Sequence, residues 1–264
     1  MPFARRKPAG FTLVELLVVI AIVSLLIGVL LPALGAARRA GLRTVSMQNQ
    51  RSLVTMLTVY AHDHDDRVPL GWSLGPGEGW KQYNYLLRTN PNGGTPSMRW
   101  MGLLYEHGAF ETPEAFYCPA ERDELMSFDT ELNPWPPDET APAGRSTRVG
   151  YGTRPLIGWP FPSDRPRPLN MPRWVRVAPG TAVVADLIHK PERLALRHLD
   201  GVHAGGADGS VAWYGRDVLD GVEVDGVRWS DTDGTGFDVA FNDLFLSADE
   251  EGIDRGLWTA LDRR

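Results

Sequence analysis

Cysteine is nearly absent from this chain of 264 residues: Cys118 is the only one, so no intramolecular disulfide can form. A basic excess is also absent, because 27 lysines and arginines stand against 33 aspartates and glutamates, for a formal net charge of −6. No broad cationic surface is therefore offered to nucleic acid, and we expect no nucleic-acid partner. The sequence contains no repeat of fixed period and no low-complexity tract.

Glycine and proline are abundant, with 28 and 21 residues, which indicates a body rich in loops. The N-terminal segment 11–31 differs from the rest of the chain, because it has no proline and is apolar except for a few positions. Its length is the roughly 20 residues that a helix needs to cross a bilayer. Arg5-Arg6-Lys7 precedes it and Glu15 lies near its start. Because a lone charge in a bilayer costs roughly 2.5 kcal/mol or more, Glu15 is a candidate functional residue.

The string Arg5-Arg6-Lys7-Pro8-Ala9-Gly10, followed by Phe11-Thr12-Leu13-Val14-Glu15, resembles the type III signal of type IV pilins and type II secretion pseudopilins. The resemblance implies that a prepilin peptidase cuts between Gly10 and Phe11 and methylates the new amine of Phe11. Glu15 and Pro32 would be the fifth and twenty-second residues of the mature chain, and Pro32 should bend or loosen the helix.

The resemblance further implies a structural subunit without catalysis of its own, assembled into a type II secretion pseudopilus or a type IV pilus-like filament. Its expected partners are the prepilin peptidase, other pilin or pseudopilin subunits and the lipid of the inner membrane. We expect a single-pass protein whose head lies in the periplasm or otherwise outside the cytoplasm. An ordinary secretory signal peptide and a plain membrane anchor are the alternatives, but neither explains Glu15 or a glycine directly before Phe11.

The physical chemistry agrees with this interpretation. A new ammonium on Phe11 supplies the cation that Glu15 lacks, and it would come from a neighbouring subunit. An ion pair in hydrocarbon is favourable only at the correct axial stagger, so it can set the register of a filament. Basic residues stand at both ends of the apolar segment, so the orientation rests on the resemblance.

Beyond Pro32 the helical pattern becomes amphipathic. One face carries Leu42, Val45, Leu53, Met56, Leu57 and Tyr60, and the other carries Arg43, Ser46, Gln50, Arg51 and Thr58. We predict one helix from about Thr12 to about His62, near 75 Å long at the standard rise. The domains are then a leader at 1–10, a helix at 11–62 with a transmembrane part at 11–31, and a head at 63–264. The fold class is α+β: a long N-terminal helix packed on a small antiparallel sheet.

The best strand patterns lie in the last third of the chain. Residues 181–186 indicate a short buried strand, 210–214 a half-buried one, and 227–229 a further candidate. Asp208-Gly209 directly before the second strand predicts a hairpin turn, because glycine accepts positive φ and aspartate caps the turn.

His198 stands nine residues before Asp208-Gly209. This spacing resembles the H-X9-DG element found at the C-terminus of many proteins with the type III leader, here at residues 198–209. The strings at 60–69 and 116–119 resemble others of the same group, with Asp66 in place of the usual glycine.

Two groups of side chains could bind a metal ion. The first consists of His198, His203, Asp200 and Asp208. A structural role is favoured there, in which His198 bonds the backbone across the glycine-rich turn and fixes the hairpin. The second, which suits Ca²⁺, consists of Asp231, Asp233 and Asp238, with oxygen donors around glycines. A solvated turn is favoured there, because the chain lacks the glutamate of a full calcium loop.

Three further candidates are weaker. His62 and Asp66 could share a helix face as metal ligands, but a polar helix exit before Pro69 is favoured. Ser73 lies in a G-x-S-x-G string, and the prolines and glycines that follow argue against a nucleophile elbow. Cys118 is expected to be a buried free thiol. A membrane-tethered hydrolase using Ser73 or the histidine cluster, and a binding module presenting its tryptophan–proline loops, therefore remain alternative functions.

Replacing Gly10 should abolish maturation, because the implied peptidase cuts directly after this glycine. In the native host, the intact mass of the purified chain should show loss of residues 1–10 and gain of one methyl group, whereas Gly10→Val should retain the leader. Normal maturation of Gly10→Val would contradict the processing interpretation.

Overall fold

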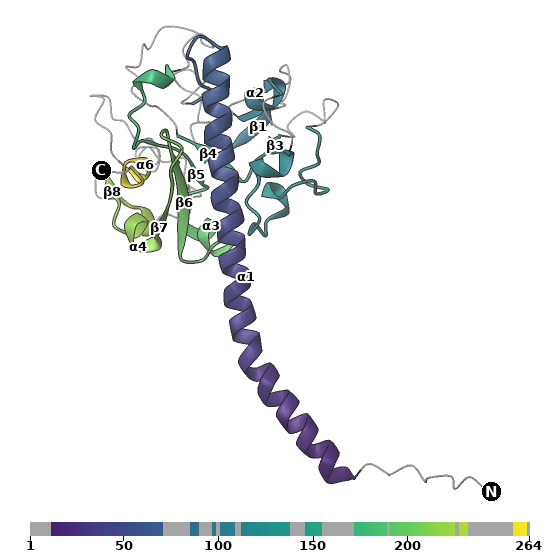
Figure 1. The fold of residues 1–264 in the computed structure, drawn as a ribbon. Helices are drawn as coiled ribbons and strands as arrows, with labels where there is room; N and C mark the ends of the chain where they lie inside the picture. The colour runs from purple at the N-terminus through teal and green to yellow at the C-terminus, as the bar shows by residue number, and fades with distance from the viewer. Residues whose placement is uncertain are drawn as a thin grey trace, which may run out of the picture. The chain divides into compact units, whose positions relative to one another are not determined.

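The computed structural model describes residues 12–70, 85–89, 97–98, 101–108, 112–137, 146–154, 172–188, 191–224, 227–231 and 256–262. The chain divides into two compact units, residues 1–42 and 43–264. One long helix is combined with antiparallel sheets, which confirms the predicted α+β class (Figure 1).

Helix α1 spans Leu13–Asp63, in agreement with the predicted helix to within one residue at each end, and it continues through Pro32. In the first unit its large apolar side chains from Leu13 to Leu31 are all exposed, between 46% and 86%. Among the described residues, α1 is the one helix long and apolar enough to cross a membrane. A helix that is apolar all round and uncovered by its own chain is consistent with membrane anchoring.

From Arg43 onward α1 belongs to the second unit, where one of its faces is buried. The buried residues are Ser46, Gln50, Leu53, Val54, Met56, Leu57, Tyr60 and Ala61. The sequence assignment of Leu53, Met56, Leu57 and Tyr60 to the packed face is confirmed. The assignment of Val45 to that face is wrong, because Val45 is 49% exposed, and so is the assignment of Ser46 and Gln50 to the opposite face.

Both polar side chains are fully buried because each finds a hydrogen-bond partner inside the head. The Ser46 hydroxyl lies 3.1 Å from the Tyr151 hydroxyl, and Gln50 Nε2 donates to the carbonyl of His203 at 3.2 Å. An amphipathic pattern read from hydrophobicity alone assigns such residues to solvent.

The main sheet has four antiparallel strands in the order β4-β5-β6-β7. They are β4 (Tyr151–Thr153), β5 (Ala182–Asp186), β6 (Gly201–Gly206) and β7 (Val211–Gly215). Strands β5 and β7 confirm the predicted strands. Strand β6 was not predicted, because its sequence Gly-Val-His-Ala-Gly-Gly has little strand propensity. Its interior position, paired with β5 on one side and β7 on the other, supplies the stabilisation that propensity lacks.

Close packing explains two glycines of β6. A Cβ on Gly201 would lie 2.3 Å from the carbonyl oxygen of Tyr214 and 2.5 Å from the Trp213 ring. A Cβ on Gly205 would lie 3.0 Å from Cγ2 of Val54 on α1. The bare strand therefore lets the helix approach the sheet closely.

The remaining elements of the second unit are short. A three-stranded sheet of order β2-β1-β3 uses β1 (Leu86–Thr89), β2 (Ser97–Met98) and β3 (Thr147–Arg148), and β8 (Glu223–Val224) pairs with β9 (Val227–Arg228). The α-helices are α2 (Met101–Glu106), α3 (Pro191–Ala195), α4 (Arg216–Asp220) and α6 (Leu257–Ala260). The 3₁₀ turns are η1 (Pro113–Phe116), η2 (Glu124–Met126), η3 (Trp174–Arg176) and η4 (Trp229–Asp231).

Gly201→Ala should destabilise the second unit by about 1–3 kcal/mol, because the new methyl meets backbone that cannot move away. Denaturant unfolding of the full chain in detergent, followed by tryptophan fluorescence, measures the change. Gly41→Ala on α1 is the matched control: it meets no atom within 4 Å and should be neutral or stabilising by up to about 1 kcal/mol. Equal midpoints for the two variants would contradict the packing argument.

Candidate functional site

The start of α1 is closed by Thr12 and Glu15. The Glu15 N–H donates to Thr12 Oγ1 at 3.2 Å, while Glu15 Oε2 accepts from the Thr12 N–H and hydroxyl, both at 2.8 Å. This reciprocal arrangement is a capping box. The pattern Thr12-x-x-Glu15 before an apolar run is the sequence signal of this box, so Glu15 is a capping residue as well as a charge near the start of the segment.

The cap gives Glu15 a second role besides the expected pairing with an amine. Both bonds from Thr12 end on the same oxygen, Oε2, and a carboxylate has about four lone-pair sites, so it can accept from further donors. The carboxylate also lies at the positive end of the helix dipole. The predicted cleavage residues Gly10 and Phe11 lie outside the described residues.

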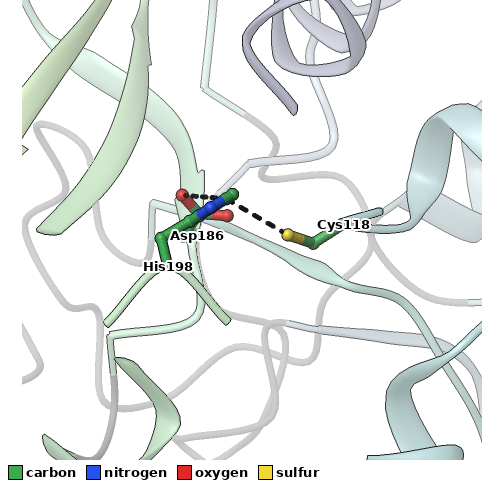
Figure 2. Close-up of side chains that lie close together, drawn as sticks. All are labelled: Cys118, Asp186 and His198. Carbon is green, nitrogen blue, oxygen red and sulfur yellow. Dashed lines mark hydrogen bonds and ion pairs between the residues drawn. The ribbon is translucent and has the colours of Figure 1, made fainter. Parts of the chain in front are cut away.

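His198 lies in a buried polar cluster. Its Nε2 is 3.4 Å from Cys118 Sγ and 3.9 Å from Asp186 Oδ2 (Figure 2). Asp186 ends β5, His198 lies just before β6, and Cys118 follows η1, so the fold brings together residues that are far apart in the sequence. The exposed fractions are 5% for His198, 4% for Cys118 and 1% for Asp186.

Asp186 is the anionic centre of this cluster. The backbone N–H of His203 donates to Asp186 Oδ2 at 2.8 Å, and His203 Nδ1 lies 3.7 Å from the same oxygen. Burial alone would raise the pKa of Asp186, but the imidazoles of His203 and His198, together with Arg197, hold it below its usual range. The other oxygen, Oδ1, is buried and has no hydrogen-bond partner among the described residues.

Arg197 and Glu121 form a buried ion pair beside the cluster, with side chains 2% and 1% exposed. Arg197 also donates to the carbonyl of Gly150. A Cβ on Gly150 would lie 2.4 Å from the Cys118 backbone nitrogen, so this glycine lets the two backbones pack closely. A buried pair of this kind holds segments together and would leave an uncompensated charge if one partner were removed.

The cluster is not arranged for nucleophilic catalysis. Burial, with a further contribution from Asp186, raises the pKa of Cys118 to about 12, so the group is a neutral thiol near pH 7. A triad needs the carboxylate on the imidazole nitrogen opposite the nucleophile, yet Cys118 and Asp186 both face Nε2 of His198. Burial also lowers the pKa of His198, against the opposing attraction of Asp186. Thiol, imidazole and carboxylate donors, all within 4.8 Å of one another, could instead hold a metal ion.

The predicted metal set around His198 is only partly brought together. The rings of His198 and His203 lie 5.5 Å apart, but Asp200 is exposed and paired with Arg43. Asp208 Oδ1 accepts from the Ser210 N–H at 2.9 Å, and so caps the turn between β6 and β7. Gly209 has a φ of +79°, so the predicted Asp-Gly hairpin turn is confirmed.

The end of α1 is a polar exit. Asp65 and Asp66 have φ of +52° and +65°, in the left-handed region that favours glycine. The Asp66 carboxylate accepts from the Val175 N–H at 3.2 Å, whereas His62 bonds Asp63. The pairing of His62 with Asp66 that a metal site there would need is absent from the described contacts. Glycine adopts this positive φ more readily than aspartate does.

The calcium candidate and Ser73 lie almost wholly outside the described residues. Asp231 is exposed in η4. Its proposed calcium partners Asp233 and Asp238, like Ser73, lie outside the described residues.

The N-terminal segment matches a known family. Residues 5–31 match the family described as "Prokaryotic N-terminal methylation motif". The match includes the predicted cleavage site, the capping box and the apolar part of α1 as far as residue 31. No curated protein and no solved structure matches the chain.

The thiol of Cys118 should be almost inert in the folded, chelator-treated protein. A pKa raised from 9.0 to about 12 lowers the thiolate fraction at pH 8 by about three orders of magnitude relative to a free cysteine. A colorimetric thiol reagent should therefore react about a thousandfold more slowly before unfolding than after it, with one thiol per chain as the end point. Equal rates in the two states would show that the thiol is accessible and ionised.

Proposed function

We propose that this chain, a type IV pilin-like protein processed by a prepilin peptidase, is a structural subunit of a pseudopilus or pilus-like filament. The methylation motif at residues 5–31 supports its pilin-like character and its processing. In this proposal the leader is removed between Gly10 and Phe11. The mature chain waits in the inner membrane with its head outside the cytoplasm, and then enters a bundle of helices.

The observation that carries the proposal is the exposed apolar surface of α1 in the first unit. From Leu13 to Leu31 every large apolar side chain is uncovered by the chain itself. Such a surface must be covered by lipid before assembly and by neighbouring helices afterwards. A membrane-tethered enzyme or binding module would need only an apolar anchor, and it would have no need of an acidic residue near the start of that anchor.

Glu15 gives the bundle its register. The capping box satisfies part of the carboxylate's hydrogen-bonding capacity, but Thr12 brings no positive charge. An unneutralised carboxylate among lipid tails costs roughly 2.5 kcal/mol or more. The ammonium of Phe11 on an adjacent subunit would neutralise it at one stagger only, so assembly would be favoured in that register.

The buried state of the histidine cluster supports a building block over a tethered hydrolase. His198 and His203 are each 5% exposed, so a macromolecular substrate has no direct access to them in this structure.

Two substitutions separate the charge of Glu15 from its cap. Glu15→Gln keeps a side chain that can complete a capping box but removes the charge, whereas Thr12→Val keeps the charge and removes the hydroxyl. We expect Glu15→Gln to reduce assembly at least tenfold and Thr12→Val to assemble nearly as well as wild type. In vivo cross-linking and electron microscopy of filaments measure assembly, and intact mass verifies that both variants are processed.

Wild-type assembly by a processed Glu15→Gln variant would overturn the register role of the charge. An equal loss in both variants would assign the effect to the cap, and would contradict the pairing between subunits.

A further inference from the structure

We propose that Cys118, Asp186 and His198 form a binding site for one divalent ion of the zinc class. The three donor atoms come from three separate segments and lie within 4.8 Å of one another in the interior of the second unit. Figure 2 shows the three side chains close together, with dashed lines joining His198 to Cys118 and to Asp186.

Two of the three donor separations are close to those of tetrahedral coordination, and all three are within 4.8 Å. Zinc binds sulfur at about 2.3 Å and nitrogen or oxygen at about 2.0–2.2 Å, which places neighbouring ligand atoms about 3.3–3.6 Å apart. The distances of 3.4 Å between Cys118 Sγ and His198 Nε2, and 3.9 Å between His198 Nε2 and Asp186 Oδ2, lie close to this range. A thiolate with an imidazole favours a zinc-type ion over Ca²⁺ or Mg²⁺, which prefer oxygen donors.

Unpartnered polar atoms provide a second, independent indication. Asp186 Oδ1 and His203 Nδ1 are buried and have no hydrogen-bond partner among the described residues. Buried polar atoms are usually satisfied, so an orphaned carboxylate oxygen calls for a ligand. His203 Nδ1 lies 3.7 Å from Asp186 Oδ2 and is a further donor for the fourth position, which a water can otherwise fill.

The surroundings suit a bound dication. The His203 N–H holds Asp186 Oδ2, which orients the carboxylate as the groups around a metal ligand commonly do. The side chains of Asp186, Glu121 and Arg197 are buried together beside the donors, so a bound dication would lie close to two carboxylates. Binding of the ion would release the Cys118 proton to solvent, because the thiolate is the form that binds metal.

The competing explanation is a metal-free hydrogen bond between Cys118 and His198. Cobalt distinguishes the two, because a thiolate bound to Co²⁺ gives a charge-transfer absorption in the near ultraviolet and tetrahedral Co²⁺ absorbs in the visible. Since Cys118 is the only cysteine of the chain, the thiolate band in the unmodified protein can come from this residue alone.

The experiment uses the full chain in detergent, reduced and freed of metal with a chelator, and titrated with Zn²⁺ or Co²⁺ alone. We expect one ion per chain with a Kd on the order of micromolar or tighter, the thiolate–cobalt band, and a raised melting temperature with Zn²⁺. Cys118→Ser and His198→Gln should each weaken binding at least about 100-fold, more than the loss of a supporting residue does. His62→Gln and Asp200→Asn, on exposed side chains of the same types, are the controls and should bind as wild type.

Circular dichroism before titration identifies any variant that fails to fold, and the cobalt spectrum of the unmodified chain decides the question without variants. Absence of the thiolate band, or of Zn²⁺ binding below about millimolar concentration, would overturn the proposal. So would unchanged binding by a folded Cys118→Ser protein.

Discussion

The close approach of α1 to β6 is the constraint on which the second unit depends. Gly205 has no side chain, so Val54 can pack against the strand, and Gln50 reaches the carbonyl of His203 beside it. Because β6 is an interior strand, its position sets that of β5 on one side and β7 on the other. The helix face and the sheet are held against each other at this point, and β5 ends at Asp186 in the interior.

Burial of Asp186 has consequences for the segments around it. A carboxylate without water must be stabilised by donors and cations, and here they come from the backbone of β6, from His198 and from Arg197. These groups are separated in the chain but close in space, so the polar cluster joins the segment after η1 to the sheet. Such networks tend to specify one arrangement of the core, because partly satisfied alternatives are costly.

The two parts of α1 illustrate how one regular element can meet two different needs. From Arg43 onward its buried face includes the polar side chains of Ser46 and Gln50, which form hydrogen bonds with the head. Before that, its apolar side chains are exposed all round and require lipid or other helices. Glu15 is held by Thr12 within the chain, yet among the described residues no cation pairs with its charge. The proposed assembly role follows from this difference between a satisfied hydrogen bond and an unneutralised charge.

The sequence by itself determined what depends on neighbours along the chain: the extent of α1, the methylation motif, the Asp208-Gly209 turn and the strands β5 and β7. Local periodicity and turn chemistry carry these signals. Only the tertiary structure decided that β6 is a strand, that Gln50 is buried, and that His198 meets Cys118 and Asp186. The physical reason is that these features depend on contacts between distant segments, where packing and burial override local propensity.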